Sequence, residues 1–226
     1  DEKFLVKRDL SLEDARNYAY DNALDVIATG FQQDKTKLIM DVKDIKALYE
    51  LALRVAKLTT FSTAKAVFGF KEESNIGIIF FPGIQAAPSF IESLLTGKKV
   101  PCLIPAAIDQ DPYWRVARDA ALRLGYYKPA QIHCRFLPGL GIGGKMSASE
   151  PETSIFTMDS PEVVERKIWN AFTGGRPTAK EQRKLGANPD VCTIYQYFLY
   201  LFEEDDKKLV DLEKQCRVGE IICGDC

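Results

Sequence analysis

Apolar residues recur every three or four positions in several parts of the chain, which is the spacing of one face of a helix. The first such stretch follows Ser11 and ends at Gly30. Ser11 is suited to the start, because its hydroxyl can accept the free N–H groups of a first helical turn. A second stretch covers residues 45–58. The pattern predicts a helix in each place.

Short apolar runs alternate with these helical stretches: residues 36–42 (TKLIMDV), 76–81 (IGIIFF), 100–104 (VPCLI) and 131–137 (QIHCRFL). Such runs are typical of buried strands. Between the last two, Asp111 as cap and Pro112 as first residue predict a helix that stops at Gly125. Strands that alternate with helices indicate an α/β fold with a parallel, doubly wound sheet.

No strand-like run follows Ser149. Ser160-Pro161 predicts a helix that ends at Gly174, and Thr178 with Glu181 forms a capping-box pattern that Gly186 closes. Asp190 is expected to cap an apolar helix over residues 191–202, and one more helix follows residues 207–208. We therefore expect an α/β part over residues 1–158 and an all-helical part over residues 159–226.

Charge and composition exclude several classes of function. The 226 residues carry 30 Lys plus Arg against 32 Asp plus Glu, so overall basicity gives no sign of nucleic-acid binding. His133 is the single histidine, which excludes every site that needs two histidines. We expect it to be a structural residue. No run reaches the roughly 18 apolar residues of a membrane span, so no membrane association is expected.

Six cysteines stand at positions 102, 134, 192, 216, 223 and 226. In a chain of this size they indicate reduced thiols in a cytosolic protein. Cys223-x-x-Cys226 is compatible with half of a zinc site or with a redox pair. Because no second pair lies nearby in the sequence, we interpret this spacing as coincidence and expect no metal site.

A glycine-rich stretch over residues 139–149 (GLGIGGKMSAS) follows the last predicted strand. It nearly fits the phosphate-binding pattern G-x-x-x-x-G-K-[ST], but Met146 stands where that pattern needs a hydroxyl. Alternatively, Lys145 supplies a flexible positive charge, and Ser147 and Ser149 supply donors, on a loop that can close over a triphosphate. A polar surface loop remains a third interpretation.

Two predicted strand ends carry polar residues where open α/β sheets bind ligands. Gln85 follows the run at 76–81, and Asp109 and Gln110 follow the run at 100–104. A buried amide must be hydrogen-bonded, either to a ligand or to loop backbone. Asp109 could accept from ribose hydroxyls or could be a turn residue.

These segments resemble a known family. Lys145-Met-Ser-Ala-Ser149 resembles the KMSKS signature of class I aminoacyl-tRNA synthetases. Ile84-Gln-Ala-Ala-Pro-Ser89 and Ala107-Ile-Asp-Gln-Asp-Pro-Tyr113 resemble tryptophanyl-tRNA synthetases of the eukaryotic cytosolic type. Residues 173–176 (TGGR) and 203–207 (EEDDK) are similar to the helical domain of that family. The three strand-end motifs occur in the order that the family has.

The resemblance implies the second half of a Rossmann-like catalytic domain, ending with the KMSAS loop, followed by part of a helical anticodon-binding domain. It implies a ligase that activates L-tryptophan with ATP and Mg²⁺ and transfers it to tRNA(Trp), as a cytoplasmic homodimer. Positioning and charge stabilisation dominate such chemistry, so no general base is needed.

The resemblance also implies a role for each matching residue. Lys145 and Ser147 would be catalytic, and Met146 and Ser149 would complete the ATP-binding loop. Asp109 would contact the ribose. Tryptophan would be bound by Glu2, Gln85 and Gln110. Arg176 would contact tRNA, although Pro177 stands where the family usually has an acidic residue.

The sequence departs from the family in one large respect. The family also needs a HIGH-type motif with two histidines, which a chain with one histidine lacks. We therefore expect a fragment of a longer protein, and we expect the isolated 226-residue chain to be inactive. A tyrosyl-tRNA synthetase-like enzyme and a non-catalytic binding fragment remain alternatives.

Overall fold

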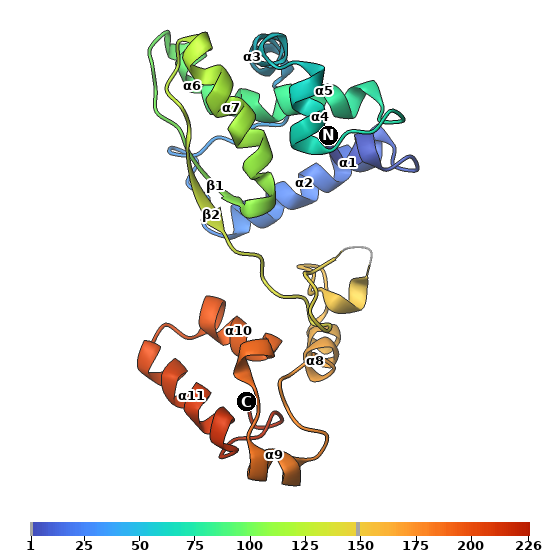
Figure 1. The fold of residues 1–226 in the computed structure, drawn as a ribbon, viewed down its shortest axis with the longest axis vertical. Coiled ribbons are helices and arrows are strands. Elements are labelled where there is room, and N and C mark those ends of the chain that lie inside the picture. Colours follow the sequence, from blue (N-terminus) through green and yellow to red (C-terminus); the bar gives the residue numbers. More distant parts are fainter. Residues whose placement is uncertain (1, 148–149) are drawn as a thin grey trace. The chain divides into compact units, whose positions relative to one another are not determined.

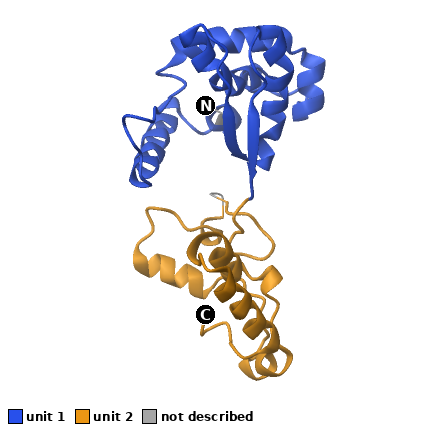
Figure 2. Cartoon of the chain, turned by 90° about the vertical axis from the view of Figure 1, so that its left-hand side faces the viewer, with its two compact units in different colours: residues 1–135 blue, residues 136–226 orange. Residues whose placement is uncertain are grey.

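The computed structural model describes residues 2–147 and 150–226. The chain divides into two compact units, unit 1 (Asp1–Arg135) and unit 2 (Phe136–Cys226), each of which is described by itself (Figures 1 and 2). The division between the units follows Arg135 in the sequence, ahead of the glycine-rich loop, whereas the predicted domain boundary lies at residue 158. The loop therefore belongs to the unit that contains the helical part.

Among its described residues, unit 1 has seven α-helices, two 3-10 helices and two strands. Its elements are α1 (Glu2–Val6), α2 (Leu12–Ala28), α3 (Ile45–Leu58), α4 (Phe61–Phe68), α5 (Ile76–Ala86), η1 (Ala87–Phe90), α6 (Ile91–Thr96), β1 (Leu103–Ala107), η2 (Ile108–Gln110), α7 (Asp111–Leu124) and β2 (Ala130–Cys134). The predicted helices at 11–30 and 45–58 are confirmed. Ser11 caps α2 through a capping box with Asp14.

The two strands form a parallel pair, in register from Leu103 opposite Ala130 to Ala107 opposite Cys134. Helix α7 connects them, as a crossover between parallel strands requires. The predicted cap of α7 is wrong in detail: Gln110 occupies the N-cap position and makes no side-chain cap, while Asp111 is the first helical residue. The predicted α/β class with parallel strands is confirmed, with a short sheet among helices.

The core of unit 1 lies where α3, α5, η1 and α7 meet. Leu48, Leu51 and Val55 project from one face of α3 and are fully buried. Phe90 of η1 is 1% exposed and stacks on Tyr126, with 5.3 Å between ring centroids. The elements that carry the strand-end motifs are therefore fixed by one shared apolar core.

Two of the four predicted strands are wrong. Residues 76–81 begin α5, because Asn75 caps its start by accepting the Ile78 N–H and the helix then packs into the core. Residues 36–42 are irregular and end in a turn in which the Lys43 N–H donates to the Met40 carbonyl. A short apolar run fits a buried helix as well as a strand, so periodicity could not separate the two.

The helical stretch Ile76–Thr96 bears on the expectation about membrane spans. By length and composition it is the one segment of the described chain that could cross a membrane. Half of it is buried inside the protein, where it packs against α3 and α7. A core helix of a globular domain has the same properties.

Among its described residues, unit 2 has helices and one isolated bridge between Pro138 and Lys145. Its elements are η3 (Pro151–Thr153), α8 (Pro161–Trp169), α9 (Ala179–Leu185), η4 (Pro189–Val191), α10 (Thr193–Tyr197), the π-helix η5 (Phe198–Phe202) and α11 (Asp206–Val218). Ser160 and Thr178 cap α8 and α9 as predicted.

Two details of the helical part differ from the prediction. Helix α8 ends at Trp169, before Gly174. Cys192 caps α10 in place of Asp190, whose carboxylate instead pairs with Arg217 at 2.6 Å. A sequence pattern identifies a side chain able to cap, but a competing long-range ion pair can take that side chain away.

Candidate active site

The two glutamines from the strand-end motifs lie together in unit 1. Gln85 is in α5, Gln110 is in η2, and the Gln85 Nε2 donates to the Gln110 Oε1 across 3.5 Å. Both side chains are half-buried. A contact of this length is weak, and each amide has further donors and acceptors for a ligand.

The carboxyl end of the sheet places acidic groups beside this pair. Strand β1 ends at Ala107 and leads directly into η2, where Asp109 is exposed. Asp111 has partners of its own, since its carboxylate pairs with Arg115 and lies 3.5 Å from the His133 Nε2. Asp109 is thus the carboxylate of this turn that is open to a ligand hydroxyl.

Hydrogen bonds hold the first residues of the glycine-rich loop in unit 2. The Tyr197 hydroxyl donates to the Pro138 carbonyl at 2.9 Å, and the Thr193 hydroxyl donates to the Gly139 carbonyl at 3.1 Å. The Phe172 N–H donates to the Leu140 carbonyl at 2.7 Å. Helix α10 and the segment at Phe172 therefore hold the start of the loop.

The loop then folds back on itself as a tight hairpin. The Gly139 N–H donates to the Gly144 carbonyl at 2.8 Å, and Pro138 bridges to Lys145. A Cβ at position 139 would lie 2.9 Å from the Lys145 carbonyl carbon and oxygen, so this close approach requires glycine. Lys145 is exposed, with its Nζ 5.1 Å from the centroid of the Phe136 ring.

A buried polar chain supports the far side of the hairpin. The Ser147 N–H donates to the Ser154 Oγ at 2.8 Å, and that hydroxyl donates back to the Ser147 carbonyl at 3.2 Å. Lys167 is 4% exposed, and its Nζ donates to the Ser154 carbonyl and to Asp159. The hydrogen bond from Lys167 lowers the pKa of Asp159 below its usual range.

The phosphate-binding interpretation G-x-x-x-x-G-K-[ST] is wrong, because no helix starts at Lys145. Residues 145–147 are irregular apart from the bridge, and η3 begins only at Pro151. The backbone therefore does not present a helix N-terminus to a phosphate.

The remaining candidate residues are less informative. Arg176 is exposed, and its Nε donates to the Gly186 carbonyl at 3.0 Å, which holds it against the turn after α9. Glu2 lies in α1, but its side chain is outside the described part of the structure. Ser149 lies outside the described residues altogether.

Sequence reasoning missed Ser154 and Lys167. One signal was present: Lys167 stands beside Ile168 and one turn after Val163 and Val164, on the apolar side of a predicted helix. A lysine at such a position is buried only when partners satisfy its charge. The partners come from residues 154 and 159, which sequence spacing alone does not place there.

The chain was compared with known protein families. The model for the family "tRNA synthetases class I (W and Y)" matches residues 6–226. The chain belongs to this family. The match covers almost the whole chain, so both compact units of this class I tRNA synthetase are included.

Curated relatives carry the name Tryptophan–tRNA ligase. The enzyme of Thermococcus onnurineus (strain NA1) is 56% identical, with 100% of this chain and 58% of the relative covered. The enzyme of Pyrococcus abyssi (strain GE5 / Orsay) is 55% identical, with 100% and 57% covered. This synthetase chain thus spans less than two thirds of the length of the curated relatives it matches.

Solved structures of synthetases have the same fold. A product-bound parasite tRNA synthetase is 38% identical, with a TM-score of 0.90 over 99% of this chain and 60% of that one. The tryptophanyl-tRNA synthetase of Aeropyrum pernix K1 is 31% identical, with a TM-score of 0.90 over 100% and 62%. The predicted fold class, an incomplete α/β sheet followed by helices, is that of the class I synthetases.

Proposed function

We propose that the protein to which this chain belongs is a tryptophan–tRNA ligase. One observation carries the proposal: the exposed Lys145 stands at the end of a glycine-rich hairpin. Hydrogen bonds hold this hairpin at its start and on its far side. The names of the relatives, which match the whole chain at 50–56% identity, support tryptophan as the amino acid over tyrosine.

In the first step, a carboxylate oxygen of tryptophan attacks the α-phosphorus of ATP. A bond forms between that oxygen and the α-phosphorus, and the bond from the α-phosphorus to the bridging oxygen breaks. Pyrophosphate leaves with the electron pair of that bond. Negative charge grows on the leaving group, so a cation held near it lowers the barrier.

Lys145 is the residue that we propose to supply this charge. Its ammonium group lies at the surface on a short hairpin, where it can reach a polyphosphate. Ser147, Met146 and Ser149 would complete the contacts with the ATP phosphates, and Asp109 would accept from the ribose hydroxyls. No side chain needs to act as a general base in this step, because the attacking carboxylate is already ionised.

Gln85 and Gln110 are proposed to bind the α-amino end of tryptophan, together with Glu2. Their mutual contact is weak at 3.5 Å, so a ligand can replace it at small cost. In the second step, a ribose hydroxyl of tRNA(Trp) attacks the carbonyl carbon of the adenylate and AMP leaves. Arg176 is proposed to contact the tRNA.

Mg²⁺ is proposed to enter with ATP. Among the described residues, no three His, Cys, Asp or Glu side chains are arranged to hold a metal ion. The ATP phosphates and water would therefore be its main ligands. No step above depends on a magnesium ion held by this chain.

Other features follow from the family. We propose a cytoplasmic homodimer in which residues 1–158 are part of the catalytic domain and residues 159–226 are part of the anticodon-binding domain. The eukaryotic cytosolic type is supported by 37% identity to the Plasmodium falciparum enzyme. A eukaryotic source does not follow, because the Thermococcus and Pyrococcus relatives are more similar.

Pyrophosphate exchange tests the proposal. The gene product at its native length should exchange pyrophosphate into ATP when tryptophan is added, and the isolated 226-residue chain should not. Exchange driven by tyrosine in place of tryptophan would favour the tyrosyl alternative. No exchange with either amino acid in the native-length protein would favour a non-catalytic binding protein.

A further inference from the structure

Two neighbouring residues near the end of α8 contact the segment that follows the glycine-rich loop. The Arg166 guanidinium donates two hydrogen bonds to the Glu152 carboxylate, at 2.6 Å and 3.1 Å. The Lys167 Nζ donates to the Ser154 carbonyl at 2.8 Å. The pair with Glu152 is exposed, so water and salt weaken it, whereas Lys167 is 4% exposed. The contact that can fix this segment firmly is therefore that of Lys167.

The Lys167 ammonium group has three partners inside unit 2. Besides the Ser154 carbonyl, it donates to the Asp159 Oδ2 at 2.6 Å and lies 4.9 Å from the centroid of the Phe156 ring. The Phe156 N–H donates to the same Asp159 oxygen at 2.9 Å. A buried ammonium group is unfavourable unless its charge is paired and hydrogen-bonded, so these contacts fix where it lies.

The segment that α8 holds contacts both ends of the glycine-rich hairpin. At its start, the Leu140 N–H donates to the Thr153 carbonyl at 2.9 Å. At its end, the Ser147 N–H donates to the Ser154 Oγ, and that hydroxyl donates back to the Ser147 carbonyl. Lys145 stands two residues before Ser147, so the position of its backbone depends on this contact. A path of hydrogen bonds thus connects α8 to the residue proposed to act on pyrophosphate.

We propose that Lys167 is a positioning residue for adenylate formation, which keeps the hairpin in the geometry that brings Lys145 to the departing pyrophosphate. Lys167 is buried and touches no substrate; it acts through Ser154. The inference rests on the proposed ligase function, in which Lys145 supplies the stabilising charge. Such a charge must be held close to its productive position, because a misplacement of about 1 Å can cost about 10²-fold in rate.

Lys167→Met tests this role, because it removes the ammonium group and keeps an unbranched side chain. In the native-length protein, the variant should slow adenylate formation by at least 10-fold at saturating ATP and tryptophan. The KM for tryptophan should not change, since Gln85 and Gln110 belong to unit 1. A variant that had only lost stability would keep its full rate at temperatures well below its unfolding transition.

A double-mutant cycle shows whether the effect passes through Lys145. Lys145→Ala removes the charge that the hairpin has to position. In that background, Lys167→Met should slow adenylate formation by about 3-fold or less, because the group that it would misplace is already absent. Two effects that multiply in full would show that Lys167 acts on the rate by another route, and would overturn the proposal.

Lys214→Met is the matched control, since Lys214 is an exposed lysine of α11. Its rate should stay within about 2-fold of the wild-type rate. Urea unfolding first establishes that each variant is folded under the assay conditions. Ser154→Ala removes only a hydroxyl from the same path, so it decides the question if Lys167→Met does not fold. It should also slow adenylate formation with an unchanged KM for tryptophan, and Lys145→Ala should again suppress its effect.

The outcomes separate this inference from the proposed function. If Lys145→Ala is slow while folded Lys167→Met or Ser154→Ala reacts at the wild-type rate, the positioning role is wrong and the ligase function stands. The same holds if Lys214→Met loses as much rate as Lys167→Met. A wild-type protein without tryptophan-dependent exchange would refute the ligase function, and this inference with it.

Discussion

The hydroxyl of Ser154 should stabilise the hairpin that carries Lys145. Ser154 is 3% exposed and makes two hydrogen bonds to the backbone of Ser147. Ser154→Ala removes both bonds while changing the volume little. At about 1 kcal/mol for each bond, the variant should lower the free energy of unfolding of unit 2 by about 1–2 kcal/mol.

Urea unfolding can measure this loss in one unit. The chain has two tryptophans, Trp114 in unit 1 and Trp169 in unit 2. In a Trp114→Phe background, fluorescence therefore reports on unit 2. With a slope of about 2 kcal/mol per molar urea, the midpoint should fall by roughly 0.5–1 M.

The control is Ser62→Ala, at an exposed serine of α4. It should change the free energy of unfolding by less than about 0.5 kcal/mol. If Ser154→Ala moved the midpoint no more than Ser62→Ala does, the hydroxyl would not be bracing the hairpin, and the argument from its two bonds would be wrong.

Three further predictions concern other parts of the chain. Gln85→Ala in the native-length enzyme should raise the KM for tryptophan by about 10-fold or more with little change in kcat, measured by pyrophosphate exchange; an unchanged KM would remove Gln85 from the tryptophan site. Phe90→Ala should lower the stability of unit 1 by about 3–5 kcal/mol in urea unfolding, because Phe90 is 1% exposed in the core; a loss below about 1 kcal/mol would contradict its packing. The pKa of Asp159 is held below its ordinary value of 3.8, so its contribution to stability is present above that pH and is lost as the pH falls through the lowered value. Asp159→Asn should therefore be less stable than wild type at neutral pH, and the difference should disappear in acid; a difference independent of pH would refute the ion pair with Lys167.

Local capping chemistry was readable from the sequence. Ser11, Ser160 and Thr178 cap helices where the pattern placed them, because a cap involves residues only three positions apart. The glycine-rich loop was also located correctly. These features depend on neighbours in sequence, which a single chain displays directly.

The errors arose where distant contacts decide the structure. The run at 76–81 became a helix because α3 and α7 bury it, and its Pro82 lies inside that helix. Pro82 favoured the end of a strand in the sequence, because proline in a helix interior removes a backbone hydrogen bond and clashes with the preceding turn. Such packing is a property of the fold and leaves no local pattern.

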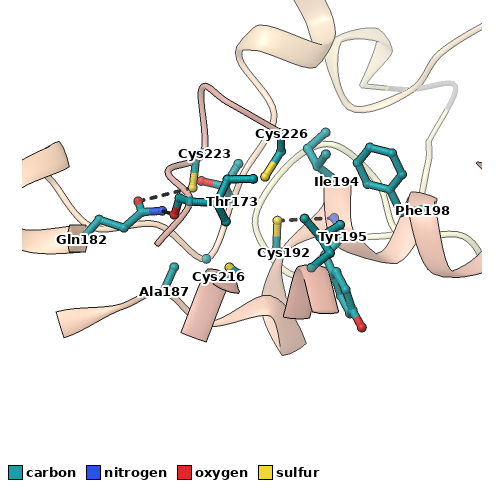
Figure 3. Close-up of a pocket in the computed structure, with 13 residues that line it drawn as sticks. Thr173, Gln182, Ala187, Cys192, Ile194, Tyr195, Phe198, Cys216, Cys223 and Cys226 are labelled. Atoms are coloured by element: carbon teal, nitrogen blue, oxygen red, sulfur yellow. Dashed lines mark hydrogen bonds between the residues drawn. The ribbon is translucent and has the colours of Figure 1, made fainter. Parts of the chain in front are cut away.

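Four cysteines of unit 2 show the same limit. Cys223-x-x-Cys226 was visible in the sequence, but Cys192 and Cys216 are distant from it along the chain. Only the fold brings the four side chains to the lining of one cavity (Figure 3).

The central claim is that the charge of Lys145 stabilises the departing pyrophosphate. Its most direct test is the rate of adenylate formation by Lys145→Ala in the native-length enzyme, with Lys99→Ala, another exposed lysine, as the control. We predict that Lys145→Ala slows the step by about 10² or more, while tryptophan affinity is unchanged and the control is unaffected. A rate equal to that of the wild type would contradict the account.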